Sequence, residues 1–342
     1  MRIIDMHCDT ISKLWEKRQM AHLEEKISGG LDGEKEQLDG LLSNNLHIDL
    51  QRMKKAGYIL QNFAMYIDLK RGLDPFDYVL ALIGVFQEEM EKNKNEISPV
   101  MCYADFIENI NRGKLSALMT IEEGGCCKGD IANLEKLYDL GARMMTLTWN
   151  YPNELASPNI VVDQKNDKGF YLFDGTKGLT ATGFSFIERM EELGIIIDVS
   201  HLSDAGFWDV AAHTKKPFVA SHSNARTLCE HARNLTDEMI RTIADSGGVI
   251  GLNFYGEFLN EINQKDSYVK RMVDHVRHII QVGGSDCLGL GSDFDGIDGT
   301  LEMKDCSQLY KFVEELERQH ISDTQIEKIL YQNTMRVYRE VL

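Results

Sequence analysis

The chain of 342 residues is long enough for one large domain, such as a (β/α)8 barrel of about 250 residues with insertions, or for two ordinary domains. Hydrophobic residues make up 43% of it and charged residues 27%, which excludes a disordered polypeptide. The formal net charge of −17 and the pI near 5.0 leave no basic stripe for phosphate backbones or anionic lipid. We therefore expect a globular protein with neither a nucleic acid nor a membrane as its partner.

The N-terminal sequence and the cysteines bear on the compartment. Met1-Arg2-Ile3-Ile4-Asp5 meets an acidic residue at once and lacks the apolar stretch of a secretory signal, and no apolar run reaches the ~20 residues of a membrane span. Seven cysteines, an odd number scattered along the chain, do not form the pattern of a disulfide framework. We expect a cytoplasmic protein with reduced thiols.

Short apolar runs recur along the chain, and each is followed by a segment with helix-spaced apolar residues. Leu134, Leu137 and Leu140 are an example of this helical spacing. The alternation is typical of βα units in a parallel sheet. The eight predicted strands are Arg2 to His7, Tyr58 to Ile67, Leu115 to Glu122, Arg143 to Trp149, Gly194 to Ser200, Pro217 to Ser223, Gly247 to Phe254 and Cys287 to Phe294.

Two segments have the composition of loop insertions. The segment near 21–48 is rich in Glu, Lys, Gly and Asp, and the segment near 150–180 concentrates Pro, Asn and Gly. Neither is long enough to be a domain, and with only five prolines the chain has no Pro-rich linker. We therefore predict a single domain over residues 1–342.

Eight strands fit a closed (β/α)8 TIM barrel, although an open doubly wound sheet is the alternative for any βα series. The polar residues favour the barrel, because the C-terminal ends of barrel strands converge on one mouth. Metal-ligand or acid–base side chains follow five of the eight strands: His7 and Asp9, Glu122, His201, His222, and Asp293.

Three histidines and two carboxylates form a donor set typical of a zinc centre, in which one anionic group can bridge a pair of ions. Buried carboxylates are also costly unless a cation pairs with them. Taken singly, His201 could be a core histidine, Glu122 a helix N-terminal acid and Asp293 a turn cap. Their common position at strand ends favours a metal-dependent hydrolase with two zinc ions, held by His7, Asp9, Glu122, His201 and His222.

Several short motifs in a fixed order carry a resemblance to a known family. They are Asp5-Met6-His7-Cys8-Asp9, Ile121-Glu122, Gly141-Ala142-Arg143, Leu147-Thr148, Gly178-Leu179-Thr180, Ile197 to Ser203, Ser221 to Ala225, Ala232-Arg233-Asn234, Asn253-Phe254-Tyr255 and Gly291 to Gly296. Each motif is weakly specific alone, but the ordered set is highly specific. With it, the chain resembles the membrane (renal) dipeptidase family nearly end to end. Members of that family are binuclear zinc barrels related to the amidohydrolases.

The resemblance implies a role for each ligand. His7 and Asp9 would hold one zinc, His201 and His222 the other, and Glu122 would bridge both. Manganese or cobalt could occupy the same ligands in place of zinc.

The resemblance also implies roles around the metals. Asp293 matches the family's proton-transfer carboxylate, Arg233 is a candidate clamp for the substrate's C-terminal carboxylate, and Tyr255 is a candidate pocket residue. Family membership further suggests acceptance of D-residues at the C-terminal position of the dipeptide, and is compatible with a homodimer.

The sequence departs from the family pattern at two places. Glu123 rivals Glu122 for the bridge, because Gly124-Gly125 could be aligned with the family's Glu-Gly-Gly by one insertion, although an ungapped match favours Glu122. Trp149 stands where better-known members carry a substrate-contacting histidine. Either Asn150 replaces that histidine, or Trp149 walls the pocket.

The predicted mechanism follows from these roles. A hydroxide that bridges the two zincs, with its pKa lowered toward ~7, attacks the single amide of a dipeptide. Asp293 takes the hydroxide's proton and delivers it to the leaving amine. Arg233 holds the far carboxylate by two parallel hydrogen bonds, which excludes longer peptides. We therefore predict a zinc-dependent dipeptidase, acting on L-L and, by family resemblance, L-D dipeptides.

Two other functions are weighed against this one. A lactonase or a hydrolase of cyclic amides could use the same metals, but such barrels commonly bridge them with a carbamylated lysine, and no lysine stands at the relevant strand ends. A non-catalytic metal-binding barrel is disfavoured by the presence of all five ligands and of Asp293, while Trp149 is the one feature in its favour.

Overall fold

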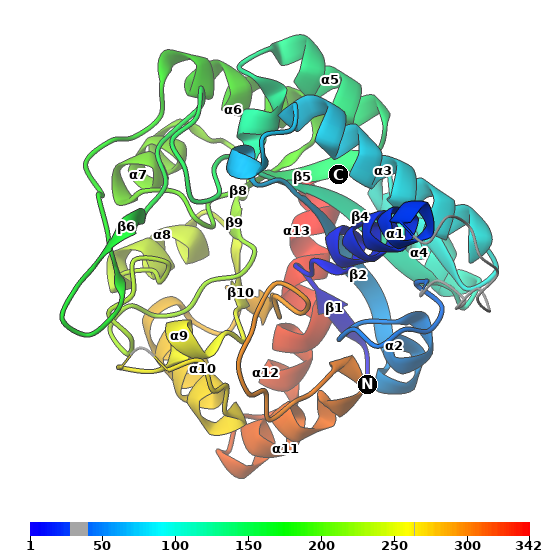
Figure 1. Cartoon of the computed structure of the whole chain (residues 1–342). Helices are drawn as coiled ribbons and strands as arrows, with labels where there is room; N and C mark the ends of the chain where they lie inside the picture. The colour runs from blue at the N-terminus through cyan, green and yellow to red at the C-terminus, as the bar shows by residue number, and fades with distance from the viewer. Residues whose placement is uncertain (28–39, 263) are drawn as a thin grey trace.

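The computed structural model describes residues 1–27, 40–262 and 264–342, and eight of its parallel strands close into a barrel. In the order of their hydrogen bonding, β2, β1, β11, β10, β9, β8, β5 and β4 follow one another, and pairing of β2 with β4 closes the ring (Figure 1). The barrel strands are β1 (Ile3–Asp5), β2 (Tyr58–Tyr66), β4 (Leu115–Glu122), β5 (Ala142–Thr146), β8 (Ile196–Asp198), β9 (Val219–Ala220), β10 (Val249–Leu252) and β11 (Leu288–Leu290). The predicted (β/α)8 barrel is confirmed.

Each of the eight predicted strands contains one barrel strand or overlaps it, but most barrel strands end earlier than predicted. Pairing in β5, for instance, stops at Thr146, three residues before Trp149. The residues beyond the last paired position belong to loops at the mouth. The side chains predicted to bind metal therefore lie mostly just after the strands, where the backbone is free to turn.

Three further strands lie outside the closed ring. β3 (Ile97–Pro99) pairs with Leu115–Ala117 at the start of β4. β6 (Val161–Lys165) and β7 (Tyr171–Leu172) form an antiparallel hairpin within the segment near 150–180 that was expected to be a loop. The sequence did not predict these strands, because β6 is largely polar and β7 and β3 are only two and three residues long.

Helices surround the barrel (Figure 1). The α-helices are α1 (Thr10–Ile27), α2 (Leu50–Ala56), α3 (Pro75–Lys92), α4 (Tyr103–Asn111), α5 (Ile131–Asp139), α6 (Ala181–Leu193), α7 (Asp204–His213), α8 (Asp237–Asp245), α9 (Gly256–Leu259), α10 (Val269–Gly283), α11 (Tyr310–Arg318), α12 (Asp323–Glu327) and α13 (Asn333–Val341). Short turns η1 (Leu69–Arg71), η2 (Gly124–Cys127) and η3 (Cys306–Gln308) are 3₁₀ helices, and η4 (Lys328–Gln332) is a π turn.

Helix α3 illustrates why these segments are helical. Asp74 precedes it and accepts hydrogen bonds from the backbone N–H groups of Phe76 and Asp77, while Pro75 occupies the first turn. The buried positions then recur at helical spacing, as at Val79, Leu82 and Phe86. The capping and the apolar stripe together direct one face of α3 against the barrel.

The C-terminal helix α13 closes the barrel at the end opposite the mouth. In Figure 1 it lies across the ring of strands. Tyr338 is completely buried and donates a hydrogen bond from its hydroxyl to Asn62 Oδ1 on β2 at 2.8 Å. The cluster that joins this helix to the strands contains Ile4, Leu60, Leu118, Met144, Ile196, Val219, Val249, Val337, Tyr338 and Val341. The barrel interior is therefore a packed core, and ligands can reach it only from the mouth.

The predicted loop insertion near 21–48 is wrong for its first part, because α1 continues to Ile27. Residues 28–39 lie outside the described residues. Residues 40–48 form bends that lead into α2, so the second part is irregular as expected.

Within residues 1–27, 40–262 and 264–342, no helix combines the length and the apolar composition needed to cross a bilayer.

Candidate metal centre

The predicted ligands come together at the mouth of the barrel. His7 and Asp9 follow β1, Glu122 ends β4, His201 follows β8 and His222 follows β9. Asp293, which follows β11, joins them. Each of the six side chains belongs to a residue that is no more than 9% exposed. Six titratable groups thus share one buried site, although 285 residues separate the first from the last along the chain.

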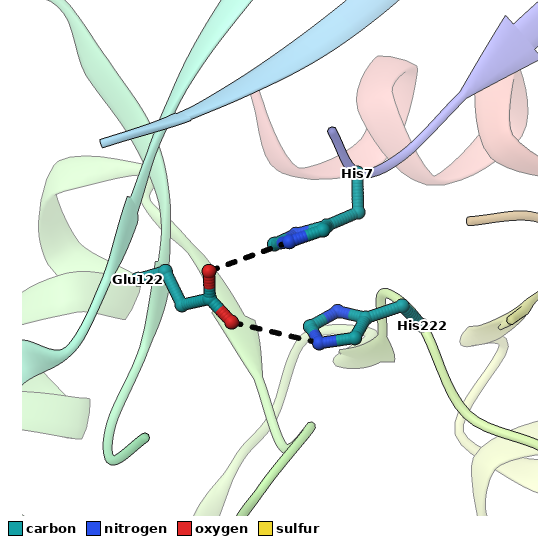
Figure 2. A group of neighbouring side chains, drawn as sticks. All are labelled: His7, Glu122 and His222. Atoms are coloured by element: carbon teal, nitrogen blue, oxygen red, sulfur yellow. Dashed lines mark ion pairs between the residues drawn. The ribbon is translucent and has the colours of Figure 1, made fainter. Parts of the chain in front are cut away.

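Glu122 lies between two groups of ligands. Its Oε2 is 3.4 Å from His7 Nε2, and its Oε1 is 3.2 Å from His201 Nε2 and 3.6 Å from His222 Nε2. Figure 2 shows the carboxylate of Glu122 directed at His7 with one oxygen and at His222 with the other. One carboxylate can therefore bind a cation with each oxygen.

The first group surrounds His7. Its Nε2 is 3.5 Å from Asp9 Oδ2 and 3.8 Å from Asp293 Oδ1. Among the described residues, His7 Nε2 and Asp9 Oδ1 are buried polar atoms without a hydrogen-bond partner. Such orphaned atoms are rare in folded proteins, and a divalent cation bound by a nitrogen and carboxylate oxygens would satisfy them.

The second group consists of His201 and His222, whose Nε2 atoms are 3.0 Å apart. Ser221 donates its hydroxyl proton to Asp198 Oδ2 at 2.5 Å, so at 2.7 Å it accepts a hydrogen bond from His222 Nδ1. The neutral imidazole of His222 then carries its lone pair on Nε2, facing His201. Because two lone pairs at this distance repel each other, the arrangement fits a cation between them and Glu122.

His201 is oriented in a similar way. Its Nδ1 is 3.0 Å from Asn150 Oδ1, which can accept its proton and leave the Nε2 lone pair directed toward the site. Burial lowers the pKa of His201 to about 4, with the positive charge of Arg233 acting in the same direction. The ring is therefore neutral at physiological pH, the state in which histidine binds metals.

The carboxylates of the first group show the same need for a cation. Burial raises the pKa of Asp9, and the nearby charge of Glu122 raises it further. Burial also raises the pKa of Asp293, and the charges of Asp9 and Glu122 add to the effect. Several buried acids in one site repel each other unless a positive charge lies among them. The residues present therefore fit a site for divalent metal ions.

Two buried aspartates at strand ends hold the ligand-carrying loops in place by hydrogen bonds. Asp5 accepts hydrogen bonds from the backbone N–H and the hydroxyl of Ser292 at 2.9 and 2.6 Å. Asp198 accepts from the backbone N–H groups of Ser200 and Ser221, both at 2.9 Å. Sequence reasoning missed these supporting roles. The available signal was an acid at the end of a wholly apolar strand.

The backbone is in the left-handed region at two site residues, His201 (φ 69°) and Asp293 (φ 61°). Residues other than glycine rarely adopt this conformation, and it concentrates at functional sites. Gly296 contributes by having no side chain, because a Cβ there would overlap the carboxylate oxygens of Asp9 and Asp293. The chain after β11 thereby approaches the ligands closely.

Glu123, the rival for the bridging position, does not face the ligands. Its buried carboxylate accepts hydrogen bonds from the backbone N–H groups of Gly125 at 2.8 Å and Trp149 at 2.9 Å, and from the amide of Asn153. Its backbone is left-handed, with φ 108°. This turn directs Glu123 into the loop after β5, whereas Glu122 faces the histidines.

A cavity of about 610 Å³ opens over the ligands, and its lining includes the four residues predicted to bind substrate. Trp149 forms part of the wall, with its ring 4.9 Å from that of Tyr66. Asn150 also lines the cavity, but its side-chain oxygen lies at His201. The geometry therefore favours Trp149 as part of the cavity wall over Asn150 as a replacement for the family's substrate-contacting histidine.

Arg233 and Tyr255 complete this lining. Arg233 is 2% exposed and donates a hydrogen bond from Nη2 to the carbonyl oxygen of His222 at 3.1 Å. Its Nε is buried without a partner among the described residues. Tyr255 donates its hydroxyl proton to Asp298 at 2.9 Å. A positive group with unused donors thus lies beside the metal ligands, where an anionic end of a substrate could bind.

A family model and two known proteins match most or all of this chain. A model of the membrane dipeptidase family, peptidase family M19, matches residues 1–342. A Klebsiella pneumoniae protein of the pqqA 5′ region is 34% identical over 272 residues, which cover 78% of this chain and 97% of that protein. An uncharacterised dipeptidase of Schizosaccharomyces pombe is 31% identical over 308 residues, which cover 86% of this chain and 72% of that protein.

Solved structures show the same fold. The crystal structure of a metallo-peptidase from Rhodobacter sphaeroides, liganded with a phosphinate mimic of the dipeptide L-Ala-D-Ala, superposes with a TM-score of 0.84 at 24% identity. The match covers 100% of this chain and 99% of that one. The family model matches the full length of the chain, and buried His and Glu side chains that could bind metal lie at the barrel mouth. The chain therefore belongs to the membrane dipeptidase family, the metallo-dipeptidases of peptidase family M19.

Proposed function

We propose that this protein hydrolyses the amide bond of L-L and L-D dipeptides with two zinc ions, held by His7, Asp9, Glu122, His201 and His222. The observation that carries the proposal is the position of Glu122, whose two oxygens face two separate sets of ligands. Imidazole nitrogens and carboxylate oxygens suit zinc, and also manganese and cobalt. The dipeptide mimic bound by the Rhodobacter sphaeroides relative supports the substrate class.

When bound, the two cations would polarise the substrate carbonyl and lower the pKa of a water molecule toward about 7, which supplies the nucleophile. The protein then has to hold the substrate and move a proton. Arg233, buried beside the ligands, binds the C-terminal carboxylate of the dipeptide. Because Arg233 lies directly beside the ligand residue His222, a clamp at this position favours a substrate with a single amide bond over a tripeptide.

Asp293 moves the proton. Asn253 donates a hydrogen bond from its side-chain amide to Asp293 Oδ2 at 2.9 Å, while Asp293 Oδ1 faces His7 Nε2 at 3.8 Å. One oxygen is therefore held in place and the other is directed at the reaction site. Asp293 Oδ1 takes the proton from the nucleophile and returns it to the leaving nitrogen, as a general base and then a general acid. The rings of Trp149 and Tyr66 exclude bulk water from one side of the cavity.

The test is turnover by protein that has been stripped of metal with a chelator and then reloaded with zinc. The substrates are a panel of L-L and L-D dipeptides, one tripeptide, one lactone and one cyclic amide. We expect zinc to restore cleavage of dipeptides alone. Cleavage of the lactone or the cyclic amide in their place would assign a different amidohydrolase activity. Two bound zinc ions per chain without any turnover would identify a non-catalytic metal-binding barrel.

A further inference from the structure

The cavity wall contains a histidine that the proposed mechanism does not use. His231 lines the cavity together with Arg233 and Phe258, and is 2% exposed. Its Nδ1 accepts a hydrogen bond from the backbone N–H of Arg233 at 3.1 Å. A neutral imidazole that accepts at Nδ1 carries its proton on Nε2. His231 therefore presents an N–H donor on its other side.

This donor is unused. Within the part of the chain that the structure describes, no group accepts a hydrogen bond from His231 Nε2, although the atom is buried. A buried donor without an acceptor is unfavourable and rare in folded proteins, so an orphaned one on a cavity wall indicates a bound partner. Arg233 Nε, two residues along the chain, is a second such atom. The same wall thus has two unsatisfied donors.

The ring of His231 is held rigidly between two aromatic rings. Phe170 meets it edge-on at a centroid distance of 5.3 Å, and Phe258 packs against it at 4.6 Å. The guanidinium of Arg233 lies 5.3 Å from the centre of the same Phe258 ring. Phe258 therefore keeps the two donors close together, and little conformational entropy is lost when a ligand binds them.

The donor is uncharged under physiological conditions. Burial lowers the pKa of His231 to about 3, and the positive charges of Arg233 and Arg226 contribute to the shift. Among the charged residues of this lining, Lys265 pairs with Asp298 at 2.6 Å, and Lys165 and Glu257 are of opposite sign. The N–H of His231 carries no charge, so it suits a neutral oxygen acceptor next to the carboxylate that Arg233 is proposed to bind.

We propose that His231 Nε2–H binds a neutral oxygen on the side chain of the substrate's C-terminal residue, so that dipeptides ending in Asn, Gln, Ser or Thr are preferred over apolar isosteres. The inference rests on the proposed dipeptidase function. Arg233 is proposed to hold the terminal carboxylate, and His231, two residues away on the same cavity wall, is then placed to meet the side chain of that same C-terminal residue. His231 is then a specificity-determining residue of the reaction.

The test compares alanyl-asparagine with alanyl-leucine, which have side chains of similar shape and differ in hydrogen bonding. Both are measured with L and D forms of the C-terminal residue, using zinc-loaded protein. For the wild type we expect kcat/KM to be about tenfold higher for the asparagine dipeptide, since loss of one such bond costs that much. In His231→Phe, which keeps a ring but has no N–H, the ratio should fall to within twofold of one.

The ratio separates this role from a structural one. His231→Phe also removes the acceptor for the N–H of Arg233, and a displaced Arg233 would slow both dipeptides alike and leave the ratio unchanged. His231→Gln, which restores an N–H donor of similar reach, should recover part of the preference for asparagine.

Two outcomes would overturn the inference. They are a wild-type ratio of one or below, and an unchanged ratio in His231→Phe, whether or not that variant slows both dipeptides equally. In each case cleavage by the wild type would leave the proposed dipeptidase function intact. If zinc-loaded wild type cleaved neither dipeptide, the proposed function would itself fail, and the inference with it.

Discussion

Replacement of Ser221 by alanine should weaken one of the two proposed metal sites and spare the other. The hydroxyl of Ser221 accepts a hydrogen bond from His222 Nδ1 at 2.7 Å and donates one to Asp198 Oδ2 at 2.5 Å. Alanine leaves the Nδ1–H of His222 buried without an acceptor. The tautomer of His222 with its proton on Nε2 then becomes more stable, and this tautomer lacks the Nε2 lone pair that a cation would bind.

The size of the effect follows from this geometry. A buried donor that loses its acceptor costs about 1–3 kcal/mol. Loss of a group that orients a metal-binding histidine typically lowers metal affinity 10–100-fold, which corresponds to about 1.4–2.7 kcal/mol. These two magnitudes agree. We therefore expect the Kd of the zinc held by His201 and His222 to rise 10–100-fold in Ser221→Ala. The site formed by His7, Asp9 and the other oxygen of Glu122 should keep its affinity.

The assay is competition for zinc against a chromogenic chelator, which resolves the two binding steps. Ser200→Ala is the matched control. Ser200 belongs to the same buried network: its hydroxyl lies 3.3 Å from that of Ser221 and accepts a hydrogen bond from the backbone N–H of His222 at 3.2 Å, whereas Ser221 accepts from the ring. Unchanged zinc affinity in Ser221→Ala, or an equal loss at both sites, would refute the assigned role. An equal effect of Ser200→Ala would show that the network acts by packing alone.

Three further predictions concern catalysis and stability. Asp293→Asn should lower kcat about 10²–10⁴-fold with two zinc ions still bound, and activity within a few-fold of wild type would remove Asp293 from proton transfer. Arg233→Met should raise KM at least tenfold with a small change in kcat, because it removes binding shared by the ground and transition states; a loss confined to kcat would contradict the clamp. His275 accepts from the N–H of Ala225 at Nδ1 and contacts the carbonyl oxygen of Leu259 with Nε2, both at 3.1 Å, and burial lowers its pKa from 6.5 to about 4. Since the unfolded chain binds this proton first, the free energy of unfolding should fall as the pH drops below about 6.5, by about 2 kcal/mol at pH 5. His275→Gln should reduce the difference between urea unfolding at pH 7 and pH 5 by this amount, and an equal difference in both proteins would exclude the contribution.

The alternation of apolar runs and helical segments was sufficient to predict the barrel. Its strands are buried on both faces, so each reads as a short continuous apolar run, and eight such runs match the eight strands of the closed ring. The same pattern located the ligands, because side chains after parallel strands must gather at one mouth. His7, Glu122 and His222 could therefore be grouped from the sequence although they lie far apart in it.

The choice between Glu122 and Glu123 shows what the sequence could not decide. The two acids are adjacent and chemically alike, and only the end of β4 and the left-handed backbone of Glu123 (φ 108°) direct one to the metals and the other to the loop after β5. The same holds for Ser221 and His231, whose roles arise from hydrogen bonds made or left unmade after folding. Residue type and order along the chain determined which groups are available and which strand ends they occupy. Only the tertiary structure decided which way each group faces, because that depends on backbone turns and buried hydrogen bonds between segments distant in sequence.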